Sequence, residues 1–161
     1  MEEIDIKRIA MEYFTRAYEA QMEGDLREAI RLYNRSLEVC PTAEAYTFLG
    51  WCFSFLTDYD RAIEYCRKAI EVDPEFGNPY NDIGAYLIEK GKLEEAIPYL
   101  QKATQAVRYD SYCFPHYNLG RVYERQGLLN RAREEYQKSL SKDPNYFLAK
   151  EALEKLSFTL Q

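Results

Sequence analysis

Side chains that could carry out covalent chemistry or bind a metal are few in this sequence and widely spaced. His116 is the only histidine, and no nucleophile or acid accompanies it in a spacing typical of catalysis. The cysteines form no CxxC pair, and each glycine has a place in a helical hairpin rather than in a phosphate-binding loop. We therefore expect a structural role for His116, and no enzyme activity, cofactor or bound metal. We expect reduced thiols, in a reducing compartment, at all four cysteines: Cys40, Cys52, Cys66 and Cys113.

Side chains suited to recognising a peptide are better represented. An asparagine amide both donates and accepts hydrogen bonds, so Asn81 and Asn118 could hold a peptide backbone. Asp82 could receive a basic side chain of the peptide, and Arg121 an acidic one. The alternative for these positions is plain solvated surface. Asn78 precedes a proline, so it could bind the peptide or could instead be the N-cap of a helix that has proline at its first position.

The elements that would position these side chains follow from residues 43–76. Tyr46, Leu49 and Phe53 recur at i, i+3 and i+7, which makes one apolar stripe along a helix. Small residues stand on this helix and on the next one, where the two backbones of a hairpin must come close: Gly50 and Ala62. A lone hairpin of this length cannot bury its apolar stripe, so copies of it must stack.

The same pattern recurs along the chain. The glycine returns after 34 residues and again after 36, at Gly50, Gly84 and Gly120. In a looser copy before them, Arg16 replaces the apolar residue of the stripe, which suits a helix at the end of a stack. In the tail, Glu154 replaces the glycine and would block the close approach of a further helix. The copies span about 10–42, 43–76, 77–110 and 113–146, and a polar-backed capping helix follows at 147–158.

One connection departs from the pattern. Two residues are inserted before the last copy, and Arg108 stands where the other copies have a terminating proline. We expect either a longer sixth helix or a bulge in the loop at 108–111.

The composition is that of a folded globular protein, with 30% charged and 47% hydrophobic residues. No segment alternates at period two over the length of a strand, so we expect an all-α fold without a sheet. The periodicity predicts nine helices, at about 5–22, 26–39, 43–56, 59–71, 78–90, 93–107, 113–126, 129–141 and 145–158.

The spacing of aromatic-x2-Leu-Gly-x2-aromatic followed by Ala-x3-aromatic resembles the tetratricopeptide repeat (TPR) family, and the resemblance covers nearly the whole chain. It implies a right-handed superhelical solenoid of about four TPR helical hairpins plus the C-terminal capping helix, forming a single TPR domain at 1–161. Members of the family line a concave groove with their first helices. They usually serve there as scaffolds or adaptors that bind a peptide or a partner helix, and they are usually not catalytic.

The groove residues are predicted from the face of each first helix that the apolar stripe leaves free. The N-terminal half of the groove is aromatic, with candidate partner-binding residues Phe14, Tyr18, Phe48, Trp51 and Phe55. The alternative for these rings is packing between neighbouring first helices. The C-terminal half carries amides and charges, with candidates Asn78, Asn81, Asp82, Asn118 and Arg121.

The partner is expected to be a protein or peptide. A formal net charge of −6 disfavours nucleic acid, and no apolar run is long enough for a membrane span, so we expect no membrane association and a cytoplasmic location. Relatives that grip the C-terminal carboxylate of large chaperones use Lys, Asn and Arg at fixed groove positions, and no cation stands there in this sequence, which speaks against that function. Two alternatives remain: a self-associating module that forms a homodimer or larger homo-oligomer through the aromatic groove, and a regulatory TPR domain of a larger protein.

Overall fold

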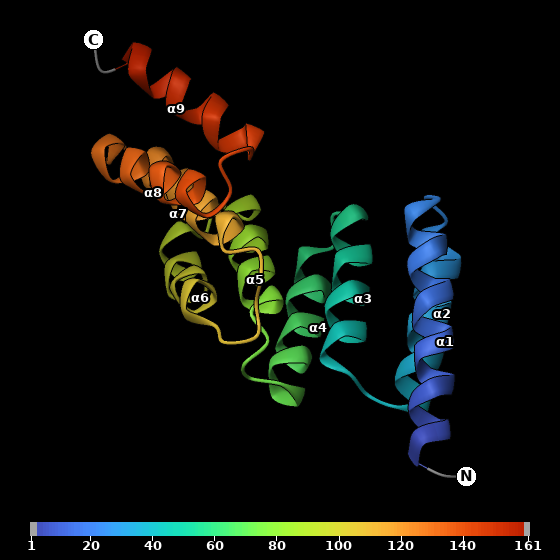
Figure 1. Cartoon of the computed structure of the whole chain (residues 1–161). Coiled ribbons are helices and arrows are strands. Elements are labelled where there is room, and N and C mark those ends of the chain that lie inside the picture. Colours follow the sequence, from blue (N-terminus) through green and yellow to red (C-terminus); the bar gives the residue numbers. More distant parts are fainter. Residues whose placement is uncertain (1–2, 160–161) are drawn as a thin grey trace.

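The structure is a computed structural model that describes residues 3–159, and it is built of α-helices throughout that range (Figure 1). Each observed helix end lies within two residues of the predicted one. The nine helices of the described range are α1 (Glu3–Met22), α2 (Leu26–Val39), α3 (Ala43–Phe55), α4 (Tyr59–Val72), α5 (Asn78–Glu89), α6 (Leu93–Gln105), α7 (Cys113–Arg125), α8 (Leu129–Lys142) and α9 (Phe147–Thr159).

The helices pack as successive antiparallel hairpins that form a solenoid (Figure 1). The pairs α1–α2, α3–α4, α5–α6 and α7–α8 make the most extensive contacts. Each second helix also packs on the first helix of the next pair, and α9 packs on α8. The first helices touch one another in the order α1, α3, α5 and α7. They therefore form a continuous layer, and the side chains of this layer that do not enter the core are available to a partner.

The glycines at the predicted close contacts do face the second helices of their hairpins. A methyl group placed on Gly50 would lie 2.9 Å from the backbone oxygen of Ala62. One placed on Gly84 would overlap the Leu100 side chain, and one on Gly120 would overlap the Tyr136 ring. The prediction of a close approach at these positions is confirmed, and it explains why the spacing of the glycines sets the repeat.

The turns inside the hairpins need a residue with positive φ. Gly24, Gly91 and Gly127 supply it in three hairpins, with φ of 85°, 74° and 76°. In the turn between α3 and α4 the residue is Thr57, with φ of 58°. A β-branched side chain is disfavoured in this left-handed region, so the α3–α4 turn carries backbone strain that the other turns avoid.

Of the two predicted alternatives, a longer sixth helix and a bulge in the loop at 108–111, the structure has the bulge. It lies in the connection at 106–112, and α6 ends two residues earlier than predicted. The bulge lies against the connection between α4 and α5, where the Arg108 N–H donates to the Glu75 carbonyl and the Gly77 N–H donates to the Arg108 carbonyl, both at 3.1 Å. The Arg108 guanidinium lies 4.2 Å from the centre of the Phe76 ring. Arg108 thus stands at the position of the terminating proline of other copies, and its backbone and side-chain contacts join the loop to the preceding repeat.

The two ends of the solenoid differ from its middle in the expected way. Arg16 on α1 is exposed, and Glu154 on α9 is exposed at the position where the other copies have a small buried residue. Ala149 and Leu156 bury the inner side of α9 against α8. The helix at 147–159 therefore covers the last hairpin with an apolar side and presents a polar position outward.

Candidate partner-binding site

The five predicted aromatic residues form one continuous cluster along α1 and α3, which we call the aromatic stripe. Neighbouring rings lie with centroids 5.4 Å apart for Phe14 and Phe48, 5.7 Å for Tyr18 and Phe48, 5.7 Å for Phe48 and Trp51, and 5.5 Å for Trp51 and Phe55. Most of these pairs meet edge to face, an arrangement that aromatic quadrupoles favour. The structure therefore brings these residues together into a single surface.

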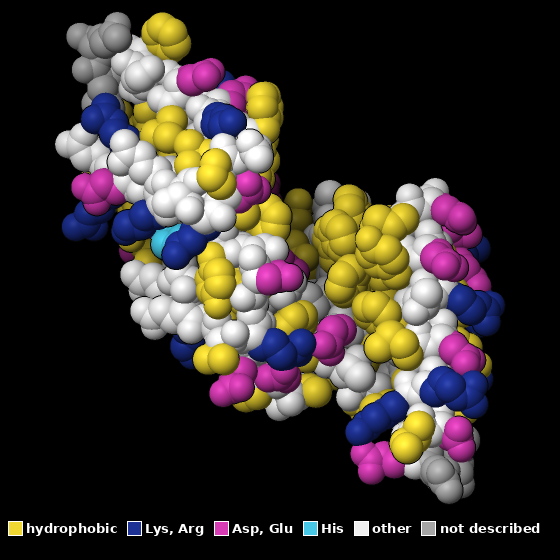
Figure 2. Space-filling model, viewed as in Figure 1, with side chains coloured by type: hydrophobic (Ala, Val, Ile, Leu, Met, Phe, Trp, Pro, Cys, Tyr) yellow, Lys and Arg dark blue, Asp and Glu magenta, His cyan; other side chains and the backbone are white. Residues whose placement is uncertain are grey.

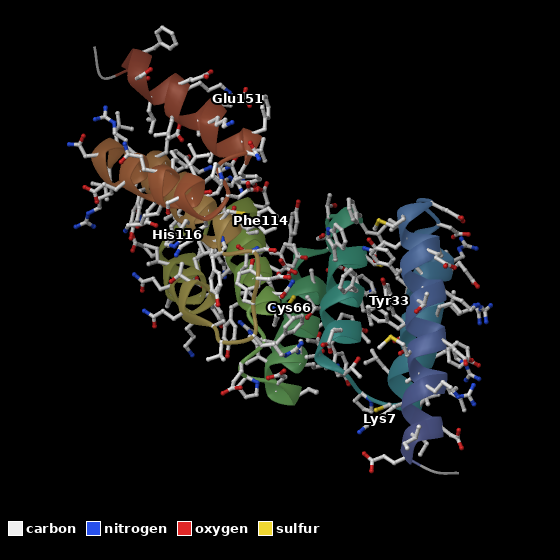
Figure 3. All side chains as sticks on the ribbon, viewed as in Figure 1. Lys7, Tyr33, Cys66, Phe114, His116 and Glu151 are labelled. Carbon is white, nitrogen blue, oxygen red and sulfur yellow. The ribbon has the colours of Figure 1, made fainter. Side chains whose placement is uncertain are left out.

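The stripe is packed at one end and open at the other. Phe14 and Phe48 are half-buried and contact the ring of Tyr33, which reaches from α2 into the space between α1 and α3 (Figure 3). Tyr18, Trp51 and Phe55 are 41%, 36% and 57% exposed. Figure 2 shows hydrophobic side chains gathered over α1 and α3 beside a hollow in the surface. Packing between first helices thus accounts for the inner rings, and it leaves the outer rings without a covering element in the described part of the chain.

The predicted amide residues make a hydrogen-bonded chain of their own. The Asn118 amide nitrogen donates to the Asn81 amide oxygen at 3.0 Å, and the Arg121 guanidinium donates to the Asn118 oxygen at 3.1 Å and to Glu89 at 2.7 Å. Asn81 and Asn118 are only 8% and 7% exposed. The two amides hold α5 and α7 together, so a peptide that uses them must compete with existing hydrogen bonds.

Asn78 lies apart from this chain. It is the first residue of α5, the N-cap position belongs to Gly77, and no side-chain cap hydrogen bond is made. The alternative interpretation of Asn78 as the N-cap is therefore wrong by one residue, and the proline stands at the second helical position. The half-buried Asn78 side chain stays a predicted contact for a partner.

Asp82 is the exception among the polar candidates because its carboxylate is nearly unpartnered. Its one hydrogen bond comes from the Asn81 amide at a long 3.4 Å, and no Lys, Arg or His of residues 3–159 forms an ion pair with it. Burial raises the pKa of Asp82 to about 7, although the hydrogen bond from Asn81 opposes the shift.

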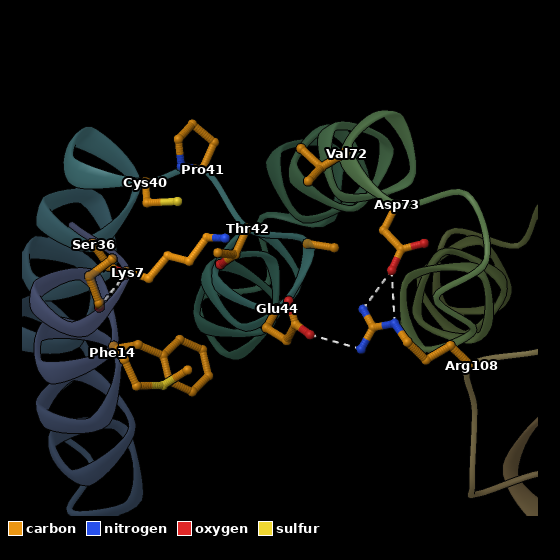
Figure 4. Close-up of a pocket in the computed structure, with 13 residues that line it drawn as sticks. Lys7, Phe14, Ser36, Cys40, Pro41, Thr42, Glu44, Val72, Asp73 and Arg108 are labelled. Atoms are coloured by element: carbon orange, nitrogen blue, oxygen red, sulfur yellow. Dashed lines mark hydrogen bonds and ion pairs between the residues drawn. The ribbon is translucent and has the colours of Figure 1, made fainter. Parts of the chain in front are cut away.

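A cavity of about 510 Å³ lies between the first two hairpins, at the end of the aromatic stripe where Phe14 is found (Figure 4). Apolar side chains line much of it, and Arg108 closes one side, where it donates to Glu44 and Asp73 at 2.8 Å each. Sequence reasoning missed this cavity because Arg108 and Glu44 are 64 residues apart and nothing in the repeat pattern relates them. The lining residues are Lys7, Ala10, Met11, Phe14, Ser36, Cys40, Pro41, Thr42, Ala43, Glu44, Val72, Asp73 and Arg108.

The residues suited to chemistry lie in ordinary packing environments. His116 is tied to Glu135 across the α7–α8 hairpin, with Nδ1 and the carboxylate oxygen 2.7 Å apart. Burial raises the pKa of the Cys52 thiol to about 12 and also raises that of Cys66, so neither is a reactive thiolate at neutral pH. Within residues 3–159, no three His, Cys, Asp or Glu side chains group closely enough to hold a metal ion, and no helix is long and apolar enough to cross a membrane.

Comparison with known proteins gives matches at the level of sequence family and of fold. Two sequence models described as "Tetratricopeptide repeat" match residues 43–76 and 76–144. The small glutamine-rich tetratricopeptide repeat-containing protein 2 of Mycosarcoma maydis is 30% identical over 87 residues, which are 53% of this chain and 25% of that protein. The protein of the same name from Saccharomyces cerevisiae is 30% identical over 124 residues, 67% of this chain and 36% of that protein. This chain thus spans well under two thirds of either relative.

Two solved structures show how far the fold is shared. Pseudomonas aeruginosa pilF superposes with a TM-score of 0.90 at 24% identity, covering 96% of this chain and 70% of that chain. The first TPR of RPAP3, solved with the HSP90 peptide SRMEEVD, superposes with a TM-score of 0.67 at 24% identity, covering 74% of this chain and 93% of that one. At these identities the likeness establishes the architecture of stacked hairpins and nothing about a ligand.

Proposed function

Because this chain belongs to the tetratricopeptide repeat family, we propose that it is a non-catalytic scaffold or adaptor that binds a peptide or partner helix along its layer of first helices. The observation that carries the proposal is the open end of the aromatic stripe. Tyr18, Trp51 and Phe55 expose large rings side by side on two adjacent helices. Contiguous exposed aromatic surface is typical of an interaction site, and aromatic anchors carry much of the binding energy at such sites.

The chemistry of the stripe favours an apolar anchor in the partner. A Leu, Met or aromatic side chain would bury apolar area against Trp51 and Phe55, while the half-buried Phe48 would form the floor beneath them. Arg121, the one cation among the predicted groove residues, is already engaged by Asn118 and Glu89 and is not free to grip a terminal carboxylate. We therefore do not extend to this chain the chaperone-tail peptide seen with the RPAP3 domain.

A comparative pull-down tests the proposal. The double variant Trp51→Ala, Phe55→Ala and the matched control Phe158→Ala are used as baits beside the wild type, because Phe158 is a 79% exposed aromatic on α9, far along the chain from the stripe. We expect partners identified by mass spectrometry on the wild type to be retained by the control and lost from the double variant. Partners that persist on the double variant would place the binding surface elsewhere.

A second candidate function is self-association through the same rings. It is favoured by the exposure of Trp51 and Phe55, since a second copy could cover the patch as well as a foreign partner could. Sedimentation velocity separates the two: a wild type that sediments as a dimer, with Trp51→Ala monomeric, would support self-association. A wild type that stays monomeric at high micromolar concentration would remove it.

The proposed location is a reducing compartment such as the cytoplasm. Cys40, Cys52, Cys66 and Cys113 are all unpaired thiols in the structure. Thiols of this kind persist where glutathione and thioredoxin keep them reduced. Fractionation of cells that express the tagged full-length protein would check the location.

A further inference from the structure

Two of the three interfaces between successive first helices are joined through the same two repeat positions. Between α1 and α3 these positions hold Phe14 and Phe48, whose rings touch edge to face at 5.4 Å. Between α5 and α7 they hold Asn81 and Asn118, which share a hydrogen bond at 3.0 Å. In the first interface two aromatic rings pack together, and in the second two amides share a hydrogen bond.

The interface between α3 and α5 has no such matched pair at these positions. Its two equivalent residues are Thr47 and Asp82, because Thr47 precedes Asn81 by 34 residues and Phe48 precedes Asp82 by 34. The Thr47 hydroxyl donates to the Ala43 carbonyl of its own helix at 2.7 Å. Asp82 is left with the long 3.4 Å contact to Asn81. A partly buried carboxylate therefore stands in the middle of the layer without a matched partner in the described range.

The groups around Asp82 do not neutralise it. The charge of Asp82 adds to the rise in the pKa of three titratable side chains, Cys66 on α4, Tyr86 on α5 and Tyr109 in the loop at 106–112. Burial raises the pKa of all three, so each is uncharged at neutral pH. The Arg121 guanidinium, which belongs to the same hydrogen-bonded chain as Asn81, is held by Asn118 and Glu89. A carboxylate with only neutral neighbours and little water has much to gain from an incoming cation.

The neighbouring rings suit such a cation. Helices α3 and α5 are in contact, and the free face of α3 carries Trp51 and Phe55. The face of an aromatic ring attracts an ammonium or guanidinium group, and the ring edge excludes water from an ion pair beside it. The carboxylate and the open end of the aromatic stripe thus lie on two helices that contact each other, Asp82 on α5 and Trp51 and Phe55 on α3.

We propose that Asp82 selects the partner: the bound segment places a lysine or arginine side chain on the Asp82 carboxylate and an adjacent bulky apolar residue on Trp51 and Phe55. This inference rests on the proposed binding function and adds to it the chemical class of the ligand, a cationic and apolar peptide. The formal charge of −6 on the chain supports the encounter with such a ligand.

A displayed library of random dodecapeptides provides the test. It is selected in parallel on the wild type, on Asp82→Asn and on Glu71→Gln, a control that removes one exposed carboxylate from α4 and so changes the net charge equally. We expect the library peptides selected on the wild type and on the control to be enriched in Lys or Arg next to Leu, Met, Phe or Trp. Library peptides selected on Asp82→Asn should keep the apolar residues and lose the enrichment in Lys and Arg.

The selected peptides are then synthesised, and their affinities for the wild type and for each variant are measured. Asp82→Asn should weaken a wild-type peptide about tenfold or more, as expected for a lost charge-assisted hydrogen bond, and Glu71→Gln should leave its affinity within about twofold. Replacing the peptide's cation by Gln should weaken binding to the wild type equally and have little effect on Asp82→Asn. Arg and Lys versions of the same peptide show whether the site prefers the planar guanidinium.

Other outcomes overturn the inference in distinguishable ways. Peptides that need Trp51 but bind Asp82→Asn with unchanged affinity and unchanged cation content would exclude a selecting role for Asp82 and leave the proposed function standing. Failure of the wild type to select any peptide that depends on Trp51 would reject both. Unchanged circular dichroism of Asp82→Asn, and agreement with a second variant, Asp82→Ala, guard against a loss of binding caused by unfolding.

Discussion

Side-chain chemistry changes along the layer of first helices, from aromatic on α1 and α3 to hydrogen-bonding on α5 and α7. The aromatic end was predictable residue by residue, because Phe48, Trp51 and Phe55 remain once the apolar stripe of their helix is assigned to the core. The amide end was not. Asn81 and Asn118 meet across 37 residues and satisfy each other, which no local pattern reveals. Polar residues on a free helix face can therefore be used inside the fold, and only their contacts decide.

The first prediction at this scale concerns Trp51. Replacing it by alanine should weaken a stripe-binding partner by at least ~2 kcal/mol, the level expected of a binding hot spot. Its stability cost should be small, because the ring is 36% exposed and its ring contacts are with Phe48 and Phe55 of the stripe. Isothermal titration and thermal melts measure the two effects. A large drop in melting temperature would show that the ring belongs to the core and that the site was misread.

The second prediction concerns the pH dependence of stability at Asp82. Its folded-state pKa of about 7 lies above the roughly 3.9 of an unfolded aspartate, so folding favours the protonated carboxyl. The stability of the wild type relative to Asp82→Asn should therefore fall as pH rises from about 4 through about 7. At pH 8 the variant should be more stable by on the order of 1–3 kcal/mol, the cost of a poorly satisfied buried polar group. Equal stability differences at pH 5 and pH 8 would contradict the assignment.

At the scale of single elements, the helices were predictable and one connection was not. The helix ends follow from small and apolar residues at a fixed spacing, so they could be placed within two residues. The loop at 106–112 depends instead on Arg108 reaching Glu44 and Asp73 in earlier repeats. Its sequence indicated only that the pattern was interrupted. The same long-range contact closes the 510 Å³ cavity, which explains why that cavity was missed.

The third prediction belongs to the turn between α3 and α4. Thr57→Gly should stabilise the protein by a few tenths to ~1 kcal/mol, because the left-handed φ of 58° costs a β-branched residue more than glycine loses in entropy. Chemical denaturation measures the change. Glu64→Gly, at an exposed position inside α4, is the matched control and should destabilise by ~1 kcal/mol. Destabilisation by Thr57→Gly would mean that the threonine side chain makes an unrecognised contribution.

At the scale of the whole molecule, we propose that residues 1–161 form one domain that unfolds as a unit. Each hairpin packs on its neighbours, and the largest cluster of buried side chains runs without interruption from α1 to α7. A stack of this kind derives its stability from the interfaces between repeats as well as from each repeat alone. A defect in the middle of the stack should therefore be felt at both ends.

The fourth prediction places such a defect at Gly84. Gly84→Leu would force α5 away from Leu100 on α6 and should cost ~1–3 kcal/mol or more through overpacking. The single tryptophan, Trp51, reports on the N-terminal half by fluorescence, while far-ultraviolet circular dichroism reports on all helices. Both signals should shift together to a lower denaturant midpoint. A Trp51 midpoint that stays at the wild-type value would mean that the halves unfold independently.

The claim that a protein partner lies against the open end of the aromatic stripe is tested most directly by photo-crosslinking. Phe55, 57% exposed at the end of α3, is replaced by p-benzoylphenylalanine, and the same replacement at Phe158 on α9 is the control. On irradiation in extract, we predict that the Phe55 position captures a discrete protein and that an excess of unlabelled wild type competes the crosslink away. If the Phe158 position captured a discrete protein and the Phe55 position captured none, the proposed binding surface would be contradicted.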